Sequence, residues 1–225
     1  MKAKIIIDAG MIILVLMQMA YHLIGDSLHG WIGMILFVLI ALHNILDRKW
    51  YLGLCKGKYT SVRFFHTAIN LLLLASFIGL AISTAFLSTT LSTFFHLKAA
   101  MIGRRMHMFF TTWSYVLMSI HVGLHWNMII CAVKKRMNDP KHLYKATARI
   151  AVTLVAAYGL YVFISRELPQ RMFLLSEYVF FDYDELILFC LIDYTSVLCL
   201  FACLTYYINA FFRKKRKCFS LDKIS

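Results

Sequence analysis

Histidines within apolar segments are the residues of this chain best suited to carry chemistry. Two pairs stand out by their spacing: His29 with His43, and His107 with His121, each fourteen residues apart. In an α-helix this spacing corresponds to about four turns and a rise of about 21 Å, so both members of a pair lie on one face. Ionisable side chains are costly in a membrane and usually mark function there. The spacing therefore predicts two functional levels along each of two helices.

Two imidazoles from facing helices can bind one iron atom from opposite sides. In parallel helices His29 comes level with His107, and His43 with His121, which predicts two bis-histidyl b-type haems inside a helical bundle. Ligation on both axial faces favours electron transfer over oxygen chemistry. We therefore expect no catalytic residues, and an electron-transfer subunit of an oxidoreductase system rather than a stand-alone enzyme.

Three further residues belong to the predicted cofactor site. His125 lies one turn beyond His121 on the same face, so either can be the inner ligand of its helix. Arg104 and Arg105 precede His107, where they can pair with haem propionates. Ordinary snorkelling of interfacial cations explains these arginines equally well.

The segments that carry these histidines are long and apolar. The chain has 225 residues, of which 61% are hydrophobic and only two are proline. Runs of about 20 apolar residues that do not alternate predict membrane-spanning helices. We expect an all-α integral membrane protein with six spans: residues 5–25, 29–47, 64–87, 106–132, 148–165 and 185–211. The first run lacks a small-residue cleavage site and is expected to be a retained helix rather than a signal peptide.

The net charge of +13 is unevenly distributed along the chain. With six spans, most of the basic residues fall on one side of the membrane, in the N-terminus, segments 47–63 and 132–149, and the C-terminal tail. The positive-inside rule then places both termini of this multi-pass membrane protein in the cytoplasm. Contact of these segments with anionic lipid head groups explains the charge better than nucleic-acid binding does.

The predicted spans define four parts of the chain. Residues 1–133 form a four-helix di-haem core similar to a cytochrome b, and 134–147 form a basic cytoplasmic loop. Residues 148–212 hold two additional membrane helices with an acidic outer loop, and 213–225 form a basic cytoplasmic tail.

Two other classes of function remain open. The histidines could serve a divalent-metal transporter or sensor, since His121 and His125 have the i, i+4 spacing of a zinc site and His66 could supply a third ligand. The chain could also be a non-catalytic membrane scaffold. The six cysteines include no CxxC pair and are interpreted as structural or incidental.

Several residues have two interpretations. His22 is more simply an interfacial histidine than a ligand. Gly33 and Gly123 could let a porphyrin approach a helix, or could serve helix packing. Asp193 could handle protons near a quinone, or could be a hydrogen-bonded structural acid.

Three stretches carry a family resemblance. They read "LHGWIGMILFVLIALHNILDRKWY", "KGKYTSVRFFHTAINLLLL" and "IGRRMHMFFTTWSYVLMSIHVGLHW". They resemble the bacterial flavinylation-associated cytochrome family, small haem-binding membrane proteins formerly classed as a domain of unknown function. The resemblance covers residues 3–130 and, less fully, 176–210.

The resemblance implies a four-helix haem-binding core and an extracytoplasmic partner that carries covalent FMN. Electrons would pass from the quinol pool through the haems to that flavin. His29, His43, His107, His121 and His125 match the histidine positions of the family, whereas His66 departs from it. The chain shows no FMN-attachment motif, so the flavin is expected on another protein.

The predicted pairing of histidines has a direct test. Replacing His43 or His121 should remove one haem and leave the other, because both residues would ligate the inner iron. The haem content of each purified variant measures this. A variant that keeps both haems would contradict the pairing.

Overall fold

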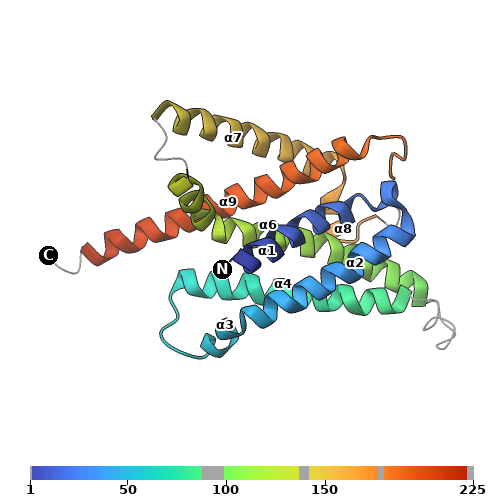
Figure 1. The fold of residues 1–225 in the computed structure, drawn as a ribbon, viewed down its shortest axis with the longest axis horizontal. Helices are drawn as coiled ribbons and strands as arrows, with labels where there is room; N and C mark the ends of the chain where they lie inside the picture. The colour runs from blue at the N-terminus through green and yellow to red at the C-terminus, as the bar shows by residue number, and fades with distance from the viewer. Residues whose placement is uncertain (1, 88–98, 137–141, 177–179, 222–225) are drawn as a thin grey trace. The chain divides into compact units, whose positions relative to one another are not determined.

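The structure is a computed structural model that describes residues 2–87, 99–136, 142–176 and 180–221 (Figure 1). All regular secondary structure of these residues is helical. The elements are α1 (Lys2–Met19), α2 (Tyr21–Leu46), α3 (Arg48–Gly53), α4 (Ser61–Leu87), α6 (Ala99–Arg136), α7 (His142–Ser165), α8 (Leu168–Met172) and α9 (Ile187–Leu221). The chain forms two compact units: unit 1 is residues 1–59 with 180–195, and unit 2 is residues 60–179 with 196–225.

Four stretches of helix are long and apolar enough to cross a membrane, which confirms an all-α membrane protein at this level. They are Tyr21–Leu46, Ser61–Leu87, Thr147–Ser165 and Ile187–Phe212. Each contains or overlaps one of the six predicted spans. The other two predicted spans, 5–25 and 106–132, also fall on helices, in α1 and α6. That these two cross the membrane stays a prediction, as does the cytoplasmic position of the termini.

Several helices run beyond the predicted boundaries of spans and domains. α6 continues to Arg136 and α7 begins at His142, so all described residues of the predicted loop 134–147 lie in helices. α9 likewise continues to Leu221, into the predicted tail 213–225. Hydropathy marks where a chain leaves the hydrocarbon, whereas lysine and arginine are good helix formers that let a helix continue past that point.

In unit 1, α1 and α2 pack together as a hairpin whose turn is set by a glycine (Figure 1). α1 ends at Met19, six residues before the predicted end of its span. α2 begins at Tyr21 but is interrupted at Gly25, which has φ 78° and ψ 162°. Side chains disfavour this conformation, so glycine is needed where the chain reverses.

In unit 2, α4 and α6 pack along their length (Figure 1). The buried side chains of Ile69, Leu117 and Leu124 form the centre of this interface, and partly buried apolar residues of both helices surround them. Leu117 and Leu124 are seven residues apart, which places them on one helix face. A buried hydrogen bond from Ser114 Oγ to Ser76 Oγ, 3.0 Å long, crosses the same interface.

Glycines mark the close helix crossings of unit 2. A Cβ at Gly123 of α6 would lie 2.6 Å from the carbonyl oxygen of Ala202 in α9, and a Cβ at Gly159 of α7 would lie 2.2 Å from that of Ser196. Small residues let membrane helices approach closely, where van der Waals packing drives association. α7 and α6 are thereby both held against α9.

The α7–α9 crossing predicts a packing defect. Gly159→Ala should lower the free energy of unfolding by about 1–3 kcal/mol, because the added methyl group has to displace the Ser196 backbone. Loss of helical circular dichroism on heating in detergent measures this. Gly53→Ala is the matched control, since its Cβ would meet nothing within 4 Å. Equal melting of the two variants would contradict the close crossing.

Candidate functional site

The predicted ligand histidines are divided evenly between the two units. His29 and His43 lie on α2 in unit 1, whereas His107 and His121 lie on α6 in unit 2. All four side chains are half-buried. Each pair therefore shares one helix, as the spacing predicts. The pairing of His29 with His107, and of His43 with His121, joins residues of different units and stays a prediction.

His107 is held by hydroxyl groups near the end of α4. Its Nδ1 lies 3.3 Å from Ser83 Oγ and 3.5 Å from Thr84 Oγ1. Both hydroxyls donate their hydrogen to the carbonyl oxygen of Leu80, at 2.7 and 2.9 Å. They can therefore only accept from the ring, so the hydrogen of the neutral imidazole lies on Nδ1 and the lone pair on Nε2.

The ring of His121 is held by a side-chain amide of α4, the helix that also holds His107. Its Nδ1 lies 2.8 Å from Asn70 Oδ1 of α4. An amide oxygen accepts hydrogen bonds, so His121 donates from Nδ1 and also has its lone pair on Nε2. α4 thus orients both predicted ligands of α6: Ser83 and Thr84 near its C-terminal end hold His107, and Asn70 in its first half holds His121.

His43 has the corresponding arrangement in unit 1, with a carboxylate as partner. Its Nδ1 lies 2.7 Å from Asp8 Oδ1 of α1. Its Nε2 lies 3.5 Å from Asp47 Oδ2, a carboxylate that also forms an ion pair with Lys4. The pKa of the neighbouring Tyr51 hydroxyl is raised, mainly by burial and also by the negative charge of the Asp47 carboxylate.

The backbone rather than the ring of His29 is held by α1. Gln18 Nε2 donates a 3.1 Å hydrogen bond to the His29 carbonyl oxygen, and the Tyr21 ring lies edge-on to the imidazole at 5.4 Å. A Cβ at Gly33 would lie 2.7 Å from the same Nε2 atom, the movable end of the Gln18 side chain. Gly33 and Gly123 thus both face neighbouring helices, which favours the packing interpretation over approach of a porphyrin.

Three of the four predicted ligands therefore donate from Nδ1 to a group on the preceding helix. Histidines that bind metal through one ring nitrogen commonly donate from the other to a carboxylate, carbonyl or similar acceptor, which fixes the tautomer and the ring orientation. The residues present thus fit the axial ligands of a haem iron. The same arrangement would suit another metal that accepts imidazole nitrogen.

His125 and His66 differ in what the structure shows. The ring centroids of His125 and His121 are 4.8 Å apart. The side chain of His125 is exposed, whereas that of His121 is half-buried. Within the described residues, His66 does not join His121 and His125 in a group of three metal ligands. The zinc alternative at this position therefore has no geometric support.

Arg104 and Arg105 are exposed in the first turns of α6, before His107. Their pairing with haem propionates stays a prediction.

The groups that hold the histidine rings were not identified from the sequence. Asp8 and Asn70 are polar residues inside apolar helices, and that property alone would have marked them as functional candidates. Their partners lie 35 and 51 residues further along the chain, and no sequence spacing reveals such distances.

No family model, no curated protein and no solved structure matches the chain. The family resemblance therefore rests on the sequence motifs alone, and the site rests on its geometry.

The bond between Asn70 and His121 predicts a positioning role. Asn70→Leu should weaken retention of the inner haem by about 10- to 100-fold, the usual effect of removing an outer-shell partner of a metal ligand. Haem retention during dilution into apomyoglobin measures this, together with the midpoint potential of the haem that remains.

Ser76→Ala is the matched control, because it removes a hydrogen bond between the same two helices without contacting a histidine. Asn70→Asp keeps an acceptor for Nδ1 and should restore retention. A merely structural role for Asn70 would make Asn70→Leu behave like Ser76→Ala and leave the potential unchanged.

Proposed function

We propose that this protein transfers electrons across a membrane through two b-type haems. In this proposal His29 and His107 ligate the outer haem, and His43 and His121 the inner one. The four histidines would hold the haems, and each bound haem would supply one-electron chemistry. The protein would act as an electron-transfer subunit that works with separate donor and acceptor proteins.

The observation that carries the proposal is the way in which the histidine rings are held. On each of the two hairpins, α1–α2 and α4–α6, the second helix bears two histidines fourteen residues apart. The first helix bears hydrogen-bond partners for three of these four rings, those of His43, His107 and His121. At His107 and His121 the partner also places the ring hydrogen on Nδ1, whereas at His43 a carboxylate lies near each ring nitrogen. A histidine that only fills space would not need its ring to be oriented in this way. A metal ligand does need this.

The apolar surroundings have a second role in the proposal. On α6, the hydroxyl groups of Thr112 and Ser119 donate to the carbonyl oxygens of Met108 and Tyr115, so these polar groups are satisfied within the helix. Low polarity excludes water from ligands and strengthens the bond between each Nδ1 and its acceptor. It also separates the two levels by an insulating layer, so that an electron crosses only where a redox centre is present.

Charged residues at the helix ends support a membrane orientation for the proposed path. Arg104 and Arg105 would contact propionates on the outer side, and Arg48, Lys49 and Arg63 would do so on the inner side. The proposed location is the bacterial cytoplasmic membrane, with six spans and both termini in the cytoplasm.

The proposed partners follow from the resemblance to flavinylation-associated cytochromes. Electrons would enter from quinol in the membrane and leave to an extracytoplasmic protein that carries FMN. The exposed acidic side chains of Asp182 and Asp184, just before α9, lie on the predicted outer side where such a partner would dock.

The visible spectrum of the purified protein, oxidised and then reduced with dithionite, tests the proposal. We expect a sharp reduced α-band of b haem and about two haems per chain, one for each level of bis-histidyl ligation. Metal analysis of the same sample provides the control. Zinc without iron would favour a divalent-metal transporter or sensor, and a colourless protein from haem-replete cells would favour a scaffold.

A further inference from the structure

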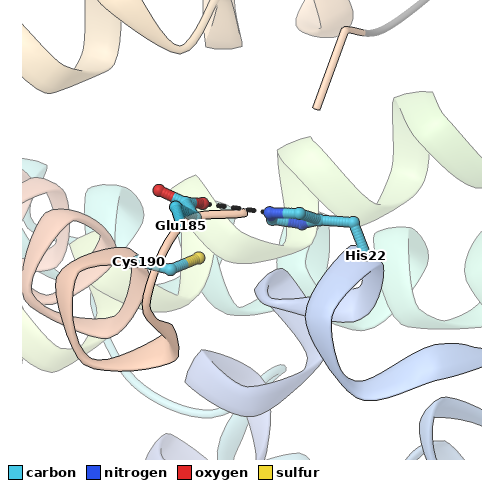
Figure 2. A group of neighbouring side chains, drawn as sticks. All are labelled: His22, Glu185 and Cys190. Carbon is cyan, nitrogen blue, oxygen red and sulfur yellow. Dashed lines mark hydrogen bonds and ion pairs between the residues drawn. The ribbon is translucent and has the colours of Figure 1, made fainter. Parts of the chain in front are cut away.

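A second group of possible metal ligands includes none of the four predicted haem ligands. It consists of His22 in the first turn of α2, Glu185 just before α9, and Cys190 in the first turns of α9 (Figure 2). Their ligand atoms all lie within 4.8 Å of one another. All three belong to unit 1, so their geometry does not depend on how the two units are placed. We call this group the His22 cluster.

The His22 cluster is buried. The side chain of His22 is 0% exposed and that of Glu185 is 14% exposed, and Cys190 is 0% exposed. His22 Nε2 lies 3.0 Å from Glu185 Oε1, and the Cys190 sulfur is directed toward the space beside this bond (Figure 2). Three donor atoms of different kinds therefore converge in a place that water hardly reaches.

The imidazole of His22 is held in position by aromatic rings. Phe181 stacks on it with ring centroids 4.6 Å apart and an interplanar angle of 20°, and Tyr183 meets it edge-on at 6.0 Å. The ring therefore has little freedom to turn away from Glu185. Its Nδ1 is buried and has no hydrogen-bond partner among the described residues. In this structure Nε2 therefore donates to the Glu185 carboxylate. When Nε2 binds a metal ion, the unoccupied Nδ1 can take the ring hydrogen, which leaves the lone pair on Nε2.

We propose that the His22 cluster binds a zinc ion. Imidazole nitrogen, carboxylate oxygen and thiolate sulfur are the three ligand types of zinc, whereas magnesium and calcium prefer oxygen alone. Buried charges in proteins are usually paired or coordinate a metal. The Glu185 carboxylate and the Cys190 thiolate each carry one negative charge, and the His22 imidazole is neutral. A divalent ion therefore makes the buried group electrically neutral.

Binding requires one balanced step. The Cys190 thiol loses its proton to solvent as the sulfur–zinc bond forms. The ring hydrogen of His22 moves from Nε2 to Nδ1, Nε2 binds the zinc ion, and Glu185 exchanges its hydrogen bond with His22 for a bond to the metal. No oxidation or reduction takes place. A water molecule or another protein group completes the tetrahedral set of four ligands.

The site would act as a clamp between distant parts of the chain. His22 and Glu185 are 163 residues apart, and a shared metal ion would hold the segment before α9 against the turn of the α1–α2 hairpin. This role goes beyond electron transfer and does not depend on it, because no predicted haem ligand belongs to the cluster.

Zinc content and the zinc X-ray absorption edge of the full-length protein test the proposal. Both measurements distinguish zinc from haem iron. After equilibration with zinc and desalting in detergent, we expect about one tightly bound zinc ion per chain, with one sulfur ligand at about 2.3 Å. Cys190→Ser should remove the sulfur signal, and Glu185→Gln should weaken zinc binding by about tenfold or more.

Cys199→Ser is the matched control, since Cys199 lies on the same helix outside the cluster and should keep both zinc and the sulfur signal. If Cys190→Ser does not fold, the wild-type spectrum decides alone. A zinc shell of nitrogen and oxygen only, or a wild-type protein that retains no zinc, would overturn the site. Either result leaves the haem content unaffected, so failure of this inference is separate from failure of the proposed function.

Discussion

The central constraint on this structure is that a polar ring inside an apolar helix pair needs a fixed partner. A histidine in such surroundings loses its hydrogen bonds to water, and the loss is costly unless a protein group replaces them. Here the partner comes from the neighbouring helix of the same hairpin: Asp8 for His43, Asn70 for His121, and the hydroxyl of Ser83 for His107. Each of these bonds orients a ring and also joins two helices, so stability and the geometry of the site have the same origin.

The same solution occurs on both hairpins with different chemistry. A carboxylate holds His43, whereas an amide holds His121 at the corresponding position of the second hairpin. A carboxylate accepts a stronger hydrogen bond and raises the basicity of the imidazole more than an amide does. If both rings ligate one iron, as proposed, its two axial ligands differ in donor strength, and this difference is a means of tuning the redox potential.

Packing between the remaining helices depends on small residues rather than on polar pairs. Gly123 and Gly159 bring α6 and α7 against the backbone of α9. Outward-facing apolar side chains such as Ile78 and Ile82 of α4 remain exposed, as expected for helices surrounded by lipid. Because lipid is as apolar as these side chains, hydrophobicity does not select partners among the helices, and close contact at glycine does.

The sequence alone determined the helical class, the position of most helices and the placement of each histidine pair on one helix. These features depend on local hydropathy and on helical periodicity, which act over a few turns. Only the tertiary structure decided which groups hold the rings, that Gly33 and Gly123 face helices, and that His22 is buried with Glu185 and Cys190. It also showed that α1 ends at Met19 and that the chain reverses at Gly25. Such contacts join residues up to 163 positions apart. Many different sequences satisfy the same hydropathy pattern, and only the packing of whole helices selects which polar residues meet.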